Sequence, residues 1–284
     1  MIARNSMHLK SLIKKMASEK NLSAQLVMQN YMLERLLERI SLSKFKENFI
    51  LKGGFLIAAI VGLDSRATMD LDTTIKGIKL TLESIGNIFE YICKIEMEDN
   101  VTFSLNRTTY IRELDEYPGI RVSLTANYSP LKVPITVDIT TGDKITPHEI
   151  EYDYQLMFDE RSISIMAYNL ETILSEKLET VLSRNIANTR PRDFYDIYIL
   201  STLHGSLYDP MILRSALEET AKKRGSLSVL PQYSGIIDNL RKDPGMLNFW
   251  TNYQRTFDYA KDISFDETCI ALMHVMRSVF SDIE

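Results

Sequence analysis

The spacing of hydrophobic residues follows a helical period at the start of the chain. Residues 7–18 and 23–42 repeat apolar side chains every three or four positions, which predicts two helices, the second capped by Ser23. The segments that follow predict a strand, a helix, a strand and a helix, in that order, at residues 48–51, 55–63, 69–76 and 80–95.

The pattern then changes to strict alternation, and later returns to the helical period. Between residues 101 and 141 the runs VTFSL, IRVSLTANY and VPITVDIT alternate apolar and polar positions, which predicts antiparallel strands. After residue 168, helices are predicted over 170–184, 191–203 and 210–223. Strands in the first half and helices in the second predict an α+β fold with two lobes that join near residue 160.

Composition and cysteine content favour a globular cytoplasmic protein. The chain has 284 residues, of which 45% are hydrophobic, so it can bury the core of one large domain or two modest ones. No apolar run reaches the roughly 18 residues of a membrane span, and the first twenty residues lack the apolar core of a secretion signal. Cys93 and Cys269 fit no metal-ligand spacing, which predicts reduced cysteines in the cytoplasm and no membrane partner.

Charge is distributed unevenly along the chain. The net charge is −5, but residues 1–46 carry +6 and the remainder carries −11. A basic end on an acidic body predicts either a surface for an anionic partner or helices with solvated lysine faces.

Acidic residues on two of the predicted strands are candidate metal ligands. In RATMDLD, a strand would place Arg66, Thr68, Asp70 and Asp72 on one side. Neighbouring carboxylates repel each other unless a cation bridges them, and oxygen ligands at this spacing suit Mg²⁺ or Mn²⁺. Asp138 occupies the polar face of VPITVDIT, and three acids on two strands can hold two divalent ions for phosphoryl displacement. The alternative is a half-exposed edge strand with its polar side chains in solvent.

A glycine pair precedes the first of these strands. Gly53 and Gly54 lead into a predicted helix, and the free N–H groups at the start of a helix attract phosphate. Glycines without side chains let a phosphate come close to the backbone. The alternative is that the two glycines simply end the preceding strand, since glycines are common before helices. The order of glycine pair, helix, D-h-D strand and later aspartate resembles the nucleotidyltransferase superfamily of the DNA polymerase β type.

Two further candidates lie in the helical half of the chain. Lys177 falls inside the apolar stripe of NLETILSEKLETVLSR, where it either extends its ammonium to solvent or points at a nucleotide phosphate. Asp193 lies in the first turn of the helix that Pro191 begins, where it either complements the helix dipole or contributes to a site.

The combined motifs resemble one known family. The segments LKGG, RATMDLD, DITTGD, SEKL and RDFYD, spread over roughly residues 30–203, look like those of the AbiEii/AbiGii toxins. These are nucleotidyltransferase toxins of abortive-infection, type IV toxin–antitoxin systems that act in phage defence, and they are related to the MenT toxins. The resemblance implies a nucleotidyltransferase lobe at residues 1–158, with a mixed sheet and a basic helical N-terminus, and a helical lobe at 159–284.

The resemblance also implies an activity and its residues. The activity is transfer of a nucleotide from an NTP, with Mg²⁺ or Mn²⁺, to an RNA acceptor such as the tRNA 3′ end. The usual partner is an antitoxin with a winged-helix DNA-binding domain. The implied metal and catalytic residues are Asp70, Asp72, Asp138, Lys177 and Asp193, and the implied nucleotide-binding residues are Gly53, Gly54, Arg66, Thr68 and Lys177.

Other functions are compatible with the same residues. A small-molecule adenylyltransferase, for example one that modifies an antibiotic, would use the same carboxylates but would not need the basic N-terminal segment. A non-catalytic nucleotide-binding module and a metal-dependent nuclease are further alternatives. The sequence selects neither the nucleotide nor the acceptor, and it leaves open whether Asp138 or Asp193 is the base.

Overall fold

The chain folds into two compact units. The computed structural model describes residues 5–111, 119–205 and 207–280. The first unit runs to Asp143 and also takes in Ile150–Ala167, and the second comprises Lys144–Glu149 and the chain from Tyr168 onward. The division expected between residues 158 and 159 falls in the turn of a β-hairpin that belongs to the first unit.

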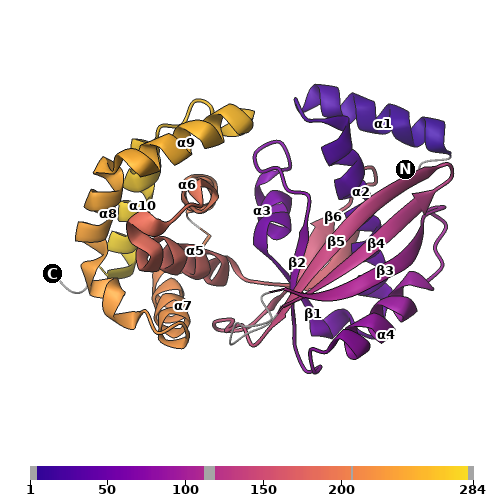
Figure 1. Cartoon of the computed structure of the whole chain (residues 1–284), viewed down its shortest axis with the longest axis horizontal. Helices are drawn as coiled ribbons and strands as arrows, with labels where there is room; N and C mark the ends of the chain where they lie inside the picture. Colours follow the sequence, from indigo (N-terminus) through magenta and orange to yellow (C-terminus); the bar gives the residue numbers. More distant parts are fainter. Residues whose placement is uncertain (1–4, 112–118, 206, 281–284) are drawn as a thin grey trace. The chain divides into compact units, whose positions relative to one another are not determined.

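The first unit is built on a mixed β-sheet (Figure 1). Its helices are α1 (Ser6–Glu19), α2 (Ala24–Leu42), α3 (Gly53–Val61) and α4 (Leu82–Cys93). Its strands are β1 (Phe49–Lys52), β2 (Leu71–Ile75), β3 (Thr102–Ile111), β4 (Gly119–Tyr128), β5 (Leu131–Thr141), β6 (Ile150–Gln155) and β7 (Ser162–Ala167). Within the described residues these seven strands have the order β3-β4-β5-β2-β1-β7-β6, with parallel pairing of β2 to β5 and of β1 to β7.

Alternation decides which face of the sheet is buried. Along β4 and β5 the apolar residues, such as Val122 and Val137, are buried, whereas the residues between them are polar and more exposed. Helices α2 and α4 pack on the buried face, where Phe49 of β1 meets Phe89 of α4 edge to face at 5.8 Å between ring centroids. The expected helices and the three alternating strands are therefore confirmed, whereas β6 and β7 were missed.

The failure to predict β6 has a physical explanation. β6 is the edge strand of the sheet, and its sequence IEYDYQ is largely exposed and polar, so it carries little hydrophobic signal.

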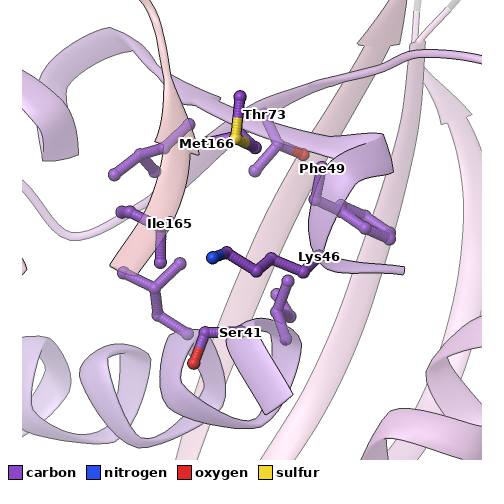
Figure 2. A pocket seen from close by; sticks show the side chains of 9 residues that line it. Ser41, Lys46, Phe49, Thr73, Ile165 and Met166 are labelled. Atoms are coloured by element: carbon purple, nitrogen blue, oxygen red, sulfur yellow. The ribbon is translucent and has the colours of Figure 1, made fainter. Parts of the chain in front are cut away.

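A small pocket lined by side chains of α2, β1, β2 and β7, including Thr73 and Met166, also lies on the buried side (Figure 2).

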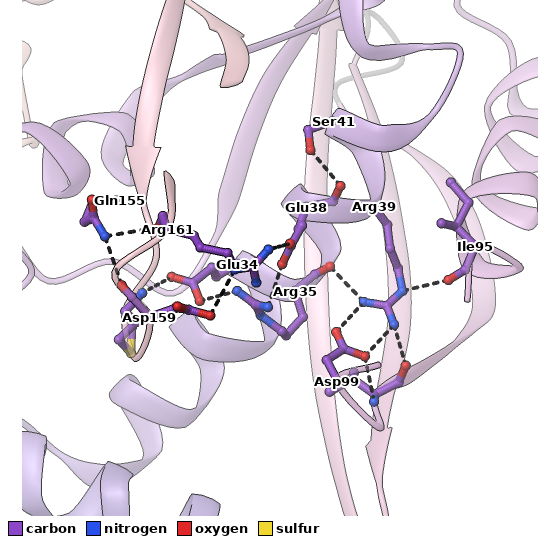
Figure 3. A network of polar contacts seen from close by, with 12 residues as sticks. Glu34, Arg35, Glu38, Arg39, Ser41, Ile95, Asp99, Gln155, Asp159 and Arg161 are labelled. Atoms are coloured by element: carbon purple, nitrogen blue, oxygen red, sulfur yellow. Dashed lines mark hydrogen bonds and ion pairs between the residues drawn. The ribbon is translucent and has the colours of Figure 1, made fainter. Parts of the chain in front are cut away.

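A fully buried arginine anchors α2 to the segment that leads into β3 (Figure 3). Arg39 donates to both carboxylate oxygens of Asp99, at 2.8 and 2.9 Å. Its other N–H groups donate to the carbonyl oxygens of Arg35, Ile95 and Val101, so all five guanidinium hydrogens are used.

A second buried charge cluster links α2 to the turn between β6 and β7 (Figure 3). Arg35 forms ion pairs with Glu34 at 2.7 Å and with Glu38 at 2.6 Å, and Arg161 reaches Glu38 at 3.1 Å. Burial raises the pKa of Glu34 to about 7, although Arg35 and the Met157 N–H oppose the shift.

These clusters change the interpretation of the basic N-terminal segment. Arg35 and Arg39 supply two of its nine positive charges, and both are buried in ion pairs, so they cannot meet an external partner. Among the described residues, α1 exposes Lys10, Lys14 and Lys15, and Arg4 lies outside those residues.

The second unit is helical throughout its regular elements. These are α5 (Leu170–Arg184), α6 (Pro191–His204), α7 (Pro210–Lys223), α8 (Tyr233–Lys242), α9 (Pro244–Thr256) and α10 (Phe265–Phe280). Aromatic side chains of α6, α9 and the following turn contact one another, among them Tyr195, Tyr253 and Tyr259. The predicted α+β class is confirmed. In the part of the chain that the structure describes, no helix has the length and apolar character to cross a membrane.

The Arg39–Asp99 pair should contribute strongly to stability. We predict that Asp99→Asn lowers the free energy of unfolding by about 3 kcal/mol, because it leaves a buried guanidinium charge without its counter-ion. Urea unfolding followed by circular dichroism measures the change. Glu19→Gln is the control, because it removes an exposed ion pair with Lys15 and should cost under about 0.5 kcal/mol. Equal costs for the two variants would contradict the prediction.

Candidate active site

Four charged side chains form a row across the sheet. Lys52 of β1 is the register partner of Asp72 of β2, which is the partner of Asp138 of β5, which in turn is the partner of Arg121 of β4. Residues directly opposite each other on paired strands project to the same side. The row therefore lies on the polar face of the sheet, away from α2 and α4.

Asp70 and Asp72 lie close together at the start of β2. Asp70 immediately precedes the strand, and the Thr136 hydroxyl donates to its Oδ1 at 3.0 Å. The Gly54 N–H donates to the carboxylate of Asp72. Burial raises the pKa of Asp72, and the negative charges of Asp138 and Asp70 raise it further against the opposing effect of Lys52. Asp72 therefore lies opposite Asp138 on the neighbouring strand, and Asp70 precedes Asp72 by two residues.

Cations flank the carboxylates at both ends of the row. Arg121 donates from Nε to Asp138 Oδ1 at 2.7 Å and from Nη2 to Oδ2 at 2.6 Å. Lys52 pairs with Asp143 at 2.5 Å. Burial alone would raise the pKa of Asp143, but the Lys52 charge, with hydrogen bonds from Lys52, Thr140 and Thr74, lowers it to about 2.

The glycine pair forms the first turn of α3, directly beside Asp72. Gly53 has φ +66°, a conformation that favours glycine. A Cβ at Gly53 would come within 2.8 Å of Asp72 Cβ. At Gly54, a Cβ would lie 3.0 Å from Thr68 Oγ1 and 3.3 Å from an Arg66 nitrogen. Gly53 is thus required by its conformation and by the close approach of Asp72, whereas a Cβ at Gly54 would make tight contacts with Thr68 and Arg66.

Arg66 and Thr68 lie in the loop before β2, and the expectation that they belong to the strand is wrong. The carbonyl oxygens of residues 68 and 69 accept from the side chains of Asn30 and Gln29 on α2, so this backbone bonds to a helix instead of a strand. Arg66 is 1% exposed and Thr68 9%. Their side chains therefore pack against the first turn of α3 at Gly54.

The chemistry of Asp70 and Asp72 fits a divalent cation. Both supply carboxylate oxygens, the ligand type that Mg²⁺ and Mn²⁺ prefer, and their mutual repulsion would be relieved by a bound cation. Among the described residues, no group of three or more acidic, histidine or cysteine side chains has the arrangement of a complete metal site. The pair would therefore need water or substrate oxygens to complete the coordination.

In the second unit, Lys177 has two carboxylate partners. Its Nζ lies 2.7 Å from Asp193 Oδ1 and 2.9 Å from Asp196 Oδ2, and both aspartates lie on α6. Burial by itself would lower the pKa of Lys177, but the charges of Asp196 and Asp193 outweigh it and raise the pKa above its ordinary value. The second oxygen of Asp193 is buried and accepts no hydrogen bond from the described residues. The structure thus joins Lys177 to Asp193 and describes both within one unit.

Sequence reasoning missed Arg121 as a site residue. The alternation of IRVSLTANY places it on the polar face with Ser123, so its orientation was predictable. Its partner was not predictable, because the register between β4 and β5 decides that Arg121 lies opposite Asp138.

Comparison with known proteins adds two findings. Residues 35–269 match the sequence profile of a family described as nucleotidyl transferase AbiEii toxin, type IV TA system. The fold is similar to crystal structures of a candidate nucleotidyltransferase from H. pylori (TM-score 0.51) and of JHP933 from Helicobacter pylori (TM-score 0.50). Each is 16% identical over 92% of this chain, covering 97% and 94% of the other chain, respectively. None of the curated proteins compared matches this chain.

The close approach of Gly53 to Asp72 can be tested by adding one methyl group. We predict that Gly53→Ala lowers the free energy of unfolding by about 2 kcal/mol, because alanine is strained at positive φ and its Cβ overlaps Asp72. Gly86→Ala, in the middle of α4 with open space around it, should instead raise it by about 0.5–1 kcal/mol. Urea unfolding compares the two, and an equally stable Gly53→Ala protein would exclude the overlap.

The low pKa of Asp143 predicts a pH-dependent contribution to stability. Its folded pKa of about 2 lies below the ordinary 3.8, so the ionised form stabilises the fold above about pH 4, and this stabilisation is lost as the pH falls through about 2. We predict that Asp143→Asn lowers the free energy of unfolding by about 2 kcal/mol at neutral pH, with a deficit that shrinks on acidification. Urea unfolding at several pH values measures it. A deficit that stays constant down to about pH 2 would contradict this explanation.

Proposed function

The chain belongs to the family of nucleotidyl transferase AbiEii toxins of type IV toxin–antitoxin systems, and on this premise we propose that it transfers a nucleotide from an NTP to the 3′ end of tRNA. The observation that carries the proposal is the placement of Asp70 and Asp72 beside the glycine-led first turn of α3. Carboxylates that attract a divalent cation next to a helix N-terminus that attracts phosphate form a suitable binding place for a metal–triphosphate complex.

Asp70 and Asp72 are the proposed metal-binding residues. A bound Mg²⁺ or Mn²⁺ would neutralise charge on the triphosphate and on the departing pyrophosphate. Thr136 orients Asp70 through its hydroxyl, and the Gly54 N–H orients Asp72, so each carboxylate is held by one hydrogen bond. The two acids are thereby positioned before substrate binds.

The first turn of α3 is the proposed phosphate-binding element. Gly53 and Gly54 present backbone without side chains, and Arg66 and Thr68 support that turn from the loop before β2. The Arg66 charge lies close to the backbone of Gly54, where it adds to the positive potential of the helix N-terminus.

Lys177 and Asp193 enter the proposal through their motif positions. Lys177 would bind a nucleotide phosphate, and Asp193 would accept the proton of the attacking hydroxyl. Asp196 keeps Lys177 paired when Asp193 is neutralised, because it contacts the same ammonium independently at 2.9 Å. Asp193 can therefore be replaced by asparagine without leaving Lys177 alone.

The partners and location follow from the same family. We propose an antitoxin with a winged-helix domain as the protein partner, phage defence as the role, and the cytoplasm, where NTPs and tRNA are present, as the location. The exposed lysines of α1 are the candidate contacts to the acceptor RNA.

Nucleotide transfer can be tested directly. We predict that the purified protein, incubated with Mg²⁺ and total tRNA, incorporates label from at least one α-³²P-NTP. Asp70→Asn should reduce the incorporation about a hundredfold or more. Mutation of residues that only hydrogen-bond to a metal ligand already lowers metal affinity or activity by up to about a hundredfold. Denaturing gels of the labelled RNA measure the incorporation and identify the nucleotide. Label that is equally strong with Asp70→Asn would contradict the role of the carboxylate pair.

Further assays test the role of Asp193 and separate the proposal from its alternatives. Asp193→Asn should lose incorporation while its thermal melting curve stays close to wild type, because the contact between Lys177 and Asp196 remains. If no NTP labels tRNA but an aminoglycoside-like or lincosamide-like acceptor is labelled, the result would favour a small-molecule adenylyltransferase. RNA cleavage in place of labelling would indicate a nuclease, and NTP binding without either reaction would indicate a non-catalytic module.

A further inference from the structure

Asp138 is already bound to a cation of the protein itself. Each of its carboxylate oxygens accepts a hydrogen bond from the Arg121 guanidinium, at 2.7 and 2.6 Å, in a bidentate geometry. A carboxylate in this arrangement directs both oxygens toward arginine. It can bind a metal ion only by giving up one of these bonds or by accepting the ion beside a positive charge.

The charges along the row match one divalent cation. Lys52 is paired with Asp143, and Arg121 is paired with Asp138, so each of these pairs is neutral. Asp70 and Asp72 remain, and neither belongs to an ion pair within the described residues. Their combined charge of about −2 is neutralised by a single Mg²⁺ or Mn²⁺, whereas a second ion would leave an excess of positive charge before any substrate arrives.

The positive charge of Arg121 is permanent. Arginine does not lose its proton in proteins, and the hydrogen bonds and charge of Asp138, followed by the charges of Asp70 and Asp72, raise the pKa of Arg121 further. The side chain of Arg121 is 46% exposed and that of Asp138 is 20% exposed, so the pair lies at the surface of the polar face. A metal ion that approaches this end of the row from solvent therefore meets the guanidinium.

We propose that Arg121 takes the place of a second divalent ion, so that the nucleotide-free protein binds one divalent cation, at Asp70 and Asp72. In this arrangement Asp138 is a positioning residue that holds Arg121, and it is not a metal ligand. The inference rests on the proposed function, because it assumes the metal role of the Asp70–Asp72 pair. It departs from the sequence-based expectation that Asp138 joins that pair to hold two ions.

Counting bound Mn²⁺ tests the inference without any turnover. The probe is Mn²⁺ itself, titrated into the full-length protein without nucleotide, with free Mn²⁺ followed by electron paramagnetic resonance. Wild type should bind one ion. Arg121→Gln frees Asp138 and should bind a second ion, with the first bound about tenfold more tightly because a nearby positive charge is gone.

Three variants act as controls for the count. Arg121→Lys keeps the charge and should stay at one ion. Arg107→Gln removes an exposed positive charge from β3, three strands away from Asp72, and should also stay at one ion. Asp138→Asn should bind one ion about tenfold more weakly than wild type, because it removes a nearby negative charge and leaves Arg121 without its partner. It should also abolish the second ion when combined with Arg121→Gln.

Two outcomes would overturn the inference. The first is a wild-type protein that binds two ions, of which Asp138→Asn loses one. The second is an Arg121→Gln protein that matches wild type in both number and affinity.

The Asp70→Asn variant separates failure of the inference from failure of the proposed function. If Asp70→Asn binds Mn²⁺ as wild type does, Asp70 is not a metal ligand, and both the inference and the proposed function fail. Two ions in wild type, together with tRNA labelling that depends on Asp70, would overturn the inference and leave the proposed function standing.

Discussion

The register of β2 between β1 and β5 brings together the charged residues of the candidate site. Leu71 and Ile75 are buried on the face that α2 and α4 cover, and the neighbouring Val137 and Ile139 of β5 are buried with them. A slip of one residue would bring Asp72 into that core and expose Leu71. The hydrophobic side of the strand therefore holds the acidic side opposite Asp138 and Lys52.

That arrangement concentrates negative charge in the first unit, where fixed cations of the same sheet compensate part of it. In the sheet, Lys52 and Arg121 bound the row of carboxylates at its two ends. The helical unit has its own example of a cation between carboxylates, because the ammonium of Lys177 pairs with both Asp193 and Asp196. Groups of this kind are costly to bury unless each charge has a partner in good geometry. Within the described part of the chain, Asp70 and Asp72 belong to no ion pair, which makes them the strongest candidates for binding an external cation.

The positions of the site residues depend on α2 as well as on the sheet. Asn30 and Gln29 of α2 hold the backbone just before Asp70. The same helix is anchored to the segment before β3 by the bond between Arg39 and Asp99. The side-chain amides of Asn30 and Gln29 thus hold the loop that carries Arg66 and Thr68. Two arginines of a segment that is basic in sequence, Arg35 and Arg39, are therefore buried in ion pairs inside the first unit, and Lys10, Lys14 and Lys15 of α1 are exposed.

The sequence alone determined the fold class, the alternating strands and the helices of the second half, because hydrophobic periodicity reports which face of each element is buried. It also placed Asp138 on a polar face, Gly53 and Gly54 beside a helix start, and Lys177 toward the interior of its helix bundle. Only the tertiary structure decided which charges meet. Strand register paired Arg121 with Asp138, helix packing placed Asp193 and Asp196 around Lys177, and hydrogen bonds from α2 kept Arg66 and Thr68 out of the strand. Contacts between residues distant in sequence depend on packing of whole elements, which periodicity within one element does not encode.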